Sequence, residues 1–324
     1  MGARREEEVR LLEGRAEGMA TPARSIMASA MAGITLELLA LQAFAGLALG
    51  TIFVLLAVGL SLIFGLLTVV NFAHGAFFMV GAYFGVYLFG LTGSFWFCLV
   101  GVPLGVGCLG LVVERILIRP LYGRNIDYPL LLTFGLGYVL VDLVRMTFGI
   151  EGRNFSTPDA LRGSVSIGVG DFPLYRLFVI GITALILLGL WWLIEGTRAG
   201  LIIRAGARDP EIVRTLGVDV SRVWLLVFAL GTALAGLAGV LAAPMRGVYP
   251  EMGVPVLIEA FVVTVVGGMG SLLGAVVAGL LLGIVVSLTS LVAPPMANIS
   301  MFVVMALVLL FRPTGLFGRA GLMG

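Results

Sequence analysis

The feature that most constrains this chain is a long stretch without charge: from Leu38 to Val113 there is no Asp, Glu, Lys or Arg. Leu177–Ile194, Val223–Met245 and Ala260–Phe311 are also free of charged residues. A helix needs roughly 20 apolar residues to cross the hydrocarbon core of a bilayer. The first run is therefore long enough for about three spans and the last for about two or three.

The charge-free runs predict the fold class. Pro129–Ile150 adds a span that Asp142 and Arg145 interrupt, and the total comes to about eight or nine. The runs are continuous and do not alternate, which favours helices over a β-barrel. Hydrophobic residues make up 60% of the 324 residues and charged residues 12%, whereas soluble domains carry about 25% charged residues. The sequence therefore predicts an all-α polytopic membrane protein with some broken or re-entrant helices.

Small residues recur at four-residue spacing in the apolar runs, as at Gly46/Gly50 and Gly279/Gly283. Such pairs let two helices approach closely in a membrane. The pattern predicts tight helix packing and does not require a transport role.

The basic residues exclude one kind of chemistry. All 20 of them are arginine, and the chain has no lysine. A Walker A loop needs its lysine to reach the terminal phosphates of ATP. We therefore expect no ATP hydrolysis by this chain alone, and no catalytic residue. One histidine and two cysteines are also too few for a typical structural zinc site, which has four ligands.

Arginine clusters indicate which loops face the cytoplasm. They occur at Arg115–Arg124, at Arg198–Arg222 and after Phe311, and positive loops stay inside. Residues 151–173 then lie outside. Three full spans before Arg115 would place residues 1–36 outside as well, whereas a re-entrant segment after Asn71 would place them inside. The predicted organisation is a polar extension over 1–36, a transmembrane domain over 37–316 and a short cytoplasmic tail over 317–324.

Ionisable side chains within or beside the spans are candidate functional groups, because charge is costly in the bilayer. They are Glu114, Asp142, Arg145 and Glu259. Glu114 and Arg145 lie near span ends, where water is within reach. Glu259 precedes a glycine-rich break by two turns.

Two polar breaks interrupt the apolar runs, at Asn71–Gly75 and at Gly267–Ser271. Asn71 and Ser271 could each cap the helix that follows. A helix N-terminus at membrane depth attracts negative charge, so each break could line a permeation path; the alternative is a buried turn between spans. The candidate pathway residues are Asn71, His74, Gly75, Glu259, Gly267, Gly268, Gly270 and Ser271.

The longest predicted cytoplasmic loop, over 204–218, contains a short helix. Asp209 is a plausible cap with Pro210 at the first helical position, and Gly217 ends the helix. We expect the apolar residues between them to share one face. So short a helix is marginal alone, so we expect it to dock on another protein, on the membrane surface or on its own bundle. The candidate docking residues are Arg204, Ala205, Ala207, Asp209, Ile212, Val213, Leu216 and Gly217.

Several ordered stretches together carry a family resemblance that covers about residues 37–318. They are Gly65–Gly85, Glu114-Arg115 with Arg119-Pro120-Leu121, Arg204–Val218 followed by Val220–Ala243, Val265–Gly283 and Arg312–Leu316. In these stretches the chain resembles the permease of bacterial branched-chain amino acid ABC importers, in particular the member whose usual partner is a second, different permease.

The resemblance implies an inner-membrane permease and a set of partners. These are a second homologous permease, two ATPase subunits that bind ATP and Mg, and a periplasmic binding protein. It implies no cofactor in this chain and no nucleic acid. The 204–218 loop matches the family's ATPase-coupling segment, although Val213 stands where the family often has Ala.

The substrate and two other functional classes stay open. Related permeases move urea, short-chain amides or other small solutes, so branched-chain amino acids are the first expectation and not the only one. A self-sufficient channel or secondary transporter would explain the helix breaks but not the docking loop. A membrane scaffold or receptor would explain neither feature.

Overall fold

The computed structural model describes residues 35–67, 70–166, 168 and 170–318. Nine helices in these residues are long and apolar enough to cross a membrane, which confirms the all-α polytopic class. They contain α2 Leu36–Leu67, α3 His74–Thr92, α4 Phe95–Val113, α5 Asp127–Phe148, α6 Leu174–Gly196, α9 Val220–Arg246, α10 Gly253–Gly267, α11 Leu272–Val292 and α12 Ala297–Phe311. The extension predicted over residues 1–36 lies almost entirely outside the described residues.

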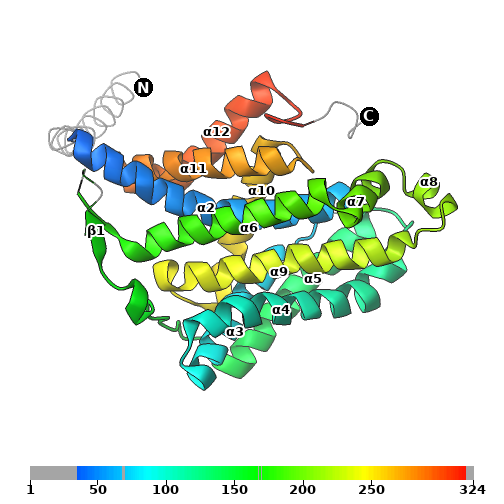
Figure 1. Cartoon of the computed structure of the whole chain (residues 1–324), viewed down its shortest axis with the longest axis horizontal. Helices are drawn as coiled ribbons and strands as arrows, with labels where there is room; N and C mark the ends of the chain where they lie inside the picture. The colour runs from blue at the N-terminus through cyan, green and yellow to red at the C-terminus, as the bar shows by residue number, and fades with distance from the viewer. Residues whose placement is uncertain (1–34, 68–69, 167, 169, 319–324) are drawn as a thin grey trace, which may run out of the picture.

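Short elements mark the two ends of the bundle (Figure 1). At one end lie α7 Arg198–Arg208 and α8 Pro210–Thr215. At the other, β1 Ser164–Ser166 pairs antiparallel with β2 Asp171–Pro173. Because α7 and α8 carry one of the arginine clusters, the positive-inside rule assigns their end to the cytoplasm and the strands to the outside.

The helix count also bears on the orientation of α2. Three helices, α2, α3 and α4, precede Arg115, and each is a candidate span. The start of α2 therefore lies at the outer end, beside β1, as Figure 1 shows. This arrangement corresponds to the first of the two topologies that the sequence allowed.

The core of the bundle is formed around α2 and α9. Helix α9 packs against α2, α3 and α4, and α2 packs along α11. Glycines make these approaches close: a methyl group added at Gly50 would lie 2.9 Å from the Gly279 carbonyl oxygen, and one at Gly46 would lie 2.6 Å from the Ile284 Cα. The predicted close helix packing at these glycine pairs is confirmed. The structure adds that Gly46/Gly50 pack on Gly279/Gly283, antiparallel because rising numbers on α2 meet falling numbers on α11.

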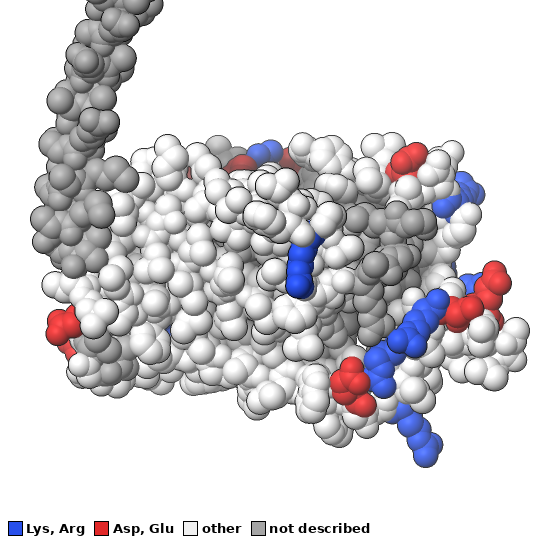
Figure 2. Space-filling model, turned by 90° about the horizontal axis from the view of Figure 1, so that it is seen from above, with Lys and Arg blue, Asp and Glu red and all other residues white. Residues whose placement is uncertain are grey.

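The peripheral helices α4, α5, α6 and α12 expose mainly apolar side chains, among them Leu131, Met146, Trp191, Trp192 and Phe311. Figure 2 shows one such face, with few charged side chains over its middle and most of them gathered at one end. Apolar surface of this extent suits lipid or another membrane protein.

Candidate functional site

The first break lies between α2 and α3, and Asn71 holds its turn. The Asn71 Oδ1 atom accepts a hydrogen bond from the Ala73 backbone N–H at 3.1 Å, and the Asn71 carbonyl accepts one from His74 N–H at 3.1 Å. The N-cap position of α3 is occupied by Ala73, without a side-chain cap. The prediction that Asn71 caps the helix is therefore wrong. Asn71 instead bonds its own backbone two residues on, which is its usual part in a turn.

His74 ties the start of α3 to α2. Its ring is fully buried, and Nε2 lies 3.1 Å from the Leu56 carbonyl oxygen. A carbonyl only accepts hydrogen bonds, so this contact assigns the ring proton to Nε2. Gly59 leaves room for the ring, because a methyl group there would come within 3.2 Å of its Cε1 atom. This geometry suits an orienting role.

Gly75 is a close-packing position. A methyl group at Gly75 would overlap the Gly253 carbonyl oxygen and lie 2.8 Å from the Leu257 Cβ. The first break therefore packs directly on α10, and its Phe72 N–H donates to the Thr133 hydroxyl of α5 at 3.2 Å.

The second break, between α10 and α11, has the expected cap. Ser271 is the N-cap of α11, and its hydroxyl accepts from the Gly274 N–H at 3.1 Å. Gly268 and Gly270 adopt positive φ values of 101° and 79°, which glycine tolerates best. Gly267 is buried and Gly270 is exposed.

The chain end covers this break. Leu316 N–H donates to the Val266 carbonyl at 2.8 Å and Phe317 N–H to the Gly267 carbonyl at 3.0 Å. The last carbonyls of α10 are satisfied in this way by a segment far away in sequence.

The two breaks contact different parts of α2. The first meets it at Leu56, and a methyl group at Gly65 would touch Gly270 of the second at 3.5 Å. These α2 positions are nine residues apart, or about 13 Å along the axis. The structure therefore places the breaks at different depths, and their role in a pathway stays a prediction.

Glu259, the remaining candidate pathway residue, is paired. Its two carboxylate oxygens accept from Arg246 at 2.8 and 3.4 Å. The Arg246 guanidinium also lies 5.6 Å from the centre of the Phe53 ring. The pair is mostly buried and joins the outer end of α9 to α10. A second cluster at the outer end is more exposed: Arg145 bonds Asp142 at 3.1 Å and Glu251 at 2.6 Å.

The cytoplasmic loop forms the helix that was expected. The Asp209 Oδ1 atom accepts from the Glu211 and Ile212 N–H groups at 3.0 Å each, Pro210 takes the first helical position, and Gly217 has a φ of 83°. The cap and the helix end are confirmed. In α7, Arg204 pairs with Glu195 at 2.9 Å and also bonds the Ile194 carbonyl.

The prediction of one shared apolar face on α8 is wrong. Val213 is buried against its own chain, with 5% exposed, whereas Ile212 is 59% and Leu216 76% exposed. Adjacent helix positions differ by about 100°, while positions four apart lie on one face. Ile212 and Leu216 therefore face outward together and Val213 faces the bundle. Ala207 is exposed and Ala205 half-buried.

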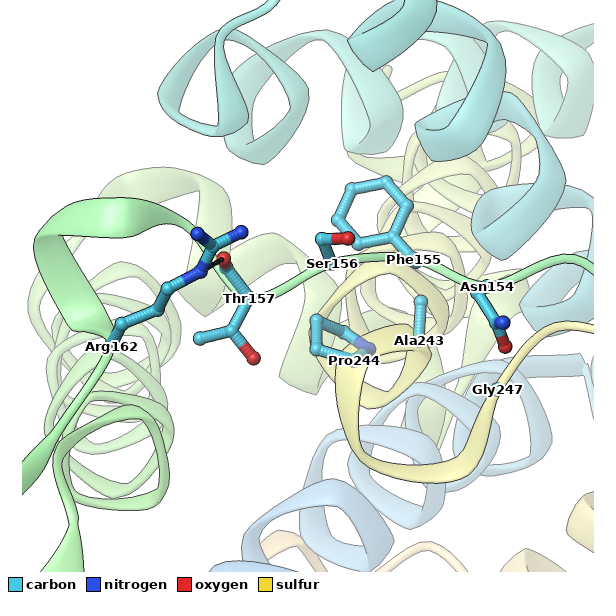
Figure 3. A pocket seen from close by; sticks show the side chains of 8 residues that line it. All are labelled: Asn154, Phe155, Ser156, Thr157, Arg162, Ala243, Pro244 and Gly247. Atoms are coloured by element: carbon cyan, nitrogen blue, oxygen red, sulfur yellow. Dashed lines mark hydrogen bonds between the residues drawn. The ribbon is translucent and has the colours of Figure 1, made fainter.

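The structure adds a pocket at the outer end that sequence reasoning missed (Figure 3). Its volume is about 400 Å³, and it lies between the 149–173 loop and the end of α9. Arg162 at its rim donates to the Thr157 carbonyl at 3.1 Å and pairs with Asp159 at 2.5 Å. The lining residues are Asn154, Phe155, Ser156, Thr157, Arg162, Ala243, Pro244 and Gly247. The stretch from Asn154 to Thr157, polar except for Phe155, was its only local signal.

Nine apolar helices in the part of the chain that the structure describes, with a polar break before α3 and another before α11, define a multi-pass membrane protein. A family model for the permease component of branched-chain amino acid transport systems matches residues 42–311. The chain belongs to this family.

Named relatives agree with the family match. BraD of Pseudomonas aeruginosa, a high-affinity branched-chain amino acid transport system permease protein, is 31% identical over 295 residues, covering 85% of this chain and 94% of BraD. LivH of Escherichia coli, described in the same words, is 31% identical over 86% of this chain and 95% of LivH. LivM of Salmonella typhimurium, also so described, is 29% identical over 71% of this chain and 60% of LivM. No solved structure matches the chain.

Proposed function

We propose that this chain forms part of the translocation path of an ABC importer for branched-chain amino acids in the bacterial inner membrane. The observation that carries the proposal is the family match, which spans the helical bundle from residue 42 to 311. The names of BraD and LivH support the substrate class. Similarity to both LivH and LivM supports pairing with a second, homologous permease.

ATP and Mg would be bound by two partner ATPase subunits. The absence of lysine supports this assignment, because a Walker A loop cannot be built without it. Helix α8 would dock the ATPase, with Ile212 and Leu216 exposed on one face as hydrophobic anchors in a groove. A periplasmic binding protein would deliver substrate to the opposite end, which carries β1, β2 and the pocket of Figure 3.

The chemistry of the path suits a zwitterion with an apolar side chain. Such a solute is neutral overall, so it needs no strong counter-charge in the wall. The helix N-termini that follow Asn71 and Ser271 offer weak positive potential to a carboxylate. The Glu259–Arg246 pair is neutral in sum and leaves no net charge to trap the cargo.

Uptake by the reconstituted complex tests this function. The complex with its second permease, ATPases and binding protein should take up leucine, isoleucine and valine only with ATP, and should not take up urea or acetamide. The matched control omits the ATPase subunits. Uptake of urea or acetamide in place of the amino acids would contradict the substrate, and uptake without ATPase would indicate a channel. The purified chain alone should hydrolyse no ATP.

A further inference from the structure

The inner end of α4 has an unusual backbone. After Val113 the helix widens into a π-helical turn over Glu114–Ile118 and then tightens into a 3-10 turn over Arg119–Leu121. π-helical turns inside or beside α-helices are rare and are frequent at functional sites. Here the turn places Glu114 fully inside the protein, although a side chain at a span end was expected to reach water.

The Glu114 carboxylate is bound on one side only. Its Oε1 atom accepts from the Tyr122 hydroxyl at 2.7 Å and lies 3.5 Å from Arg119 Nε. Its Oε2 atom is buried without a hydrogen-bond partner. Burial and the neighbouring carboxylate raise the pKa of the Tyr122 phenol, so it stays a donor. A buried carboxylate with one oxygen left without a hydrogen bond adds little to the stability of the fold. We therefore look for its role in how it positions the neighbouring helices.

From this carboxylate, contacts lead to the start of α9. Arg119 donates to the Ser221 carbonyl in the first turn of α9 at 3.0 Å. The Tyr122 ring meets Trp224 of α9 edge to face, with ring centres 4.6 Å apart and planes at 78°. The end of α4 and the start of α9 are thereby joined by a hydrogen bond from the charged Arg119 guanidinium and by an aromatic pair.

The contacts continue from α9 to α8. The guanidinium of Arg214, on α8, lies 5.6 Å from the centre of the Trp224 ring, within the range of a cation–π interaction. The line of contacts Glu114–Tyr122–Trp224–Arg214 thus connects the π-helical turn to the helix that exposes Ile212 and Leu216. We call Glu114, Tyr122, Trp224 and Arg214 the inner clamp.

We propose that the inner clamp holds α8 and the inner ends of α4 and α9 together as one rigid body, so that a displacement of α8 is passed directly to α9. Helix α9 packs against α2, α3 and α4, so its movement is passed to these three helices. The inference rests on the proposed function, because a docked ATPase would supply the displacement. The four side chains are positioning residues that touch no substrate.

The rigidity of the inner clamp can be tested without measuring transport. Spin labels go on exposed Ile116 of the π-helical turn and exposed Thr215 of α8, after replacement of Cys98 and Cys108 by alanine. The distance between the labels is measured by pulsed EPR in the full chain in nanodiscs and in the full complex, with and without ATP. We expect one narrow distance in all three states, and a broad distribution in Tyr122→Phe and in Trp224→Leu.

Coupling is the second readout. In the reconstituted complex, Tyr122→Phe and Trp224→Leu should lower the amino acid moved per ATP hydrolysed by about fivefold or more, the usual scale of coupling between sites. Trp224→Phe keeps an aromatic face for Tyr122 and Arg214 and should restore most of that ratio. The matched control is Tyr175→Phe, which removes a buried hydroxyl, bonded to the Leu241 carbonyl at 2.8 Å, at the outer end of the bundle.

Two results would overturn the inner clamp: a label distance that changes with ATP in the otherwise unaltered complex, or clamp variants that keep both the narrow distance and the transport ratio. Failure of the proposed function has a different signature. It would appear as no ATP-dependent uptake by the unaltered complex, while the distance measured in the chain alone would still decide whether the clamp is rigid.

Discussion

Ile212 and Val213 are adjacent residues of α8 with opposite environments, one exposed and one buried. A carboxylate at position 213 would be buried within this chain without a partner, at a cost of several kcal/mol, about 2–5. A carboxylate at 212 or 216 would stay in water until a partner covers it. We therefore expect Val213→Asp to lower the melting temperature of the purified chain, and Ile212→Asp and Leu216→Asp to leave it unchanged but abolish co-purification with the ATPase.

The control for these α8 variants is Glu211→Gln, which alters an exposed residue of the same helix without adding buried charge. Retention of the ATPase by the double variant Ile212→Asp/Leu216→Asp would show that α8 docks through some other surface.

Gly75 and Gly90 lie on the same helix and allow a matched comparison. A methyl group at Gly75 would overlap the Gly253 carbonyl, whereas one at Gly90 would meet nothing within 4 Å. Gly75→Ala should destabilise the chain by about 1–3 kcal/mol through overpacking. Gly90→Ala should be neutral or stabilising by about 0.5–1 kcal/mol. Thermal unfolding in detergent measures both, and equal melting temperatures would contradict the packing role of Gly75.

The packing around Gly75 and Gly268 also decides what a larger side chain at either position would do. If the two breaks lined a path, leucine at Gly75 or Gly268 would fill that path and leave assembly of the complex unchanged. Both positions are instead packed against backbone, Gly75 against Gly253 and Gly268 against Gly318. Leucine at either position should therefore reduce folding yield before it affects uptake.

At the scale of elements, most local signals were readable, apart from the cap predicted at Asn71, whereas contacts between segments distant in sequence were not. The caps at Asp209 and Ser271 and the helix end at Gly217 depend on residues within one turn, and the structure has all three. Three features depend instead on segments far away in sequence. They are the direction in which Val213 points, the burial of Glu114 and the contact of Leu316 and Phe317 with the second break. No periodicity within a single helix encodes them, which is why each was missed or wrongly assigned.

The segment that covers the second break, which includes Leu316 and Phe317, leads to a prediction about the stability of the ends of α10 and α11. Gly315 and Gly247 both have positive φ, 79° and 73°, so alanine at either is strained by about 1–2 kcal/mol. Only Gly315 is also crowded, since a methyl group there would lie 2.6 Å from Gly268 N and from the Val265 carbonyl oxygen. Gly315→Ala should therefore speed hydrogen exchange at the end of α10 and the start of α11, and Gly247→Ala should not. Equal hydrogen-exchange protection of this region in both variants would contradict the conclusion that the segment around Gly315 covers the second break.

For the whole molecule, two signals disagree about orientation. Arg4, Arg5, Arg10, Arg15 and Arg24 precede α2 and by the positive-inside rule favour a cytoplasmic start. The structure favours the reverse, because the three candidate spans α2, α3 and α4 precede Arg115 and α2 begins at the end opposite α7 and α8 (Figure 1). We give precedence to the structure, since a cytoplasmic start would require one of the three helices before Arg115 not to cross the membrane.

Site-directed labelling decides the orientation. In a chain with Cys98 and Cys108 replaced by alanine, single cysteines at Leu36, Ser164 and Thr215 occupy exposed positions. A membrane-impermeant maleimide added to right-side-out vesicles should label positions 36 and 164, and should label position 215 only after the vesicles are opened. If position 36 instead behaves like 215, one of the three helices before Arg115 does not cross the membrane. The segment from Asn71 through α3 would then be re-entrant, and α2 and α11 would both have to be inverted relative to the outer strands.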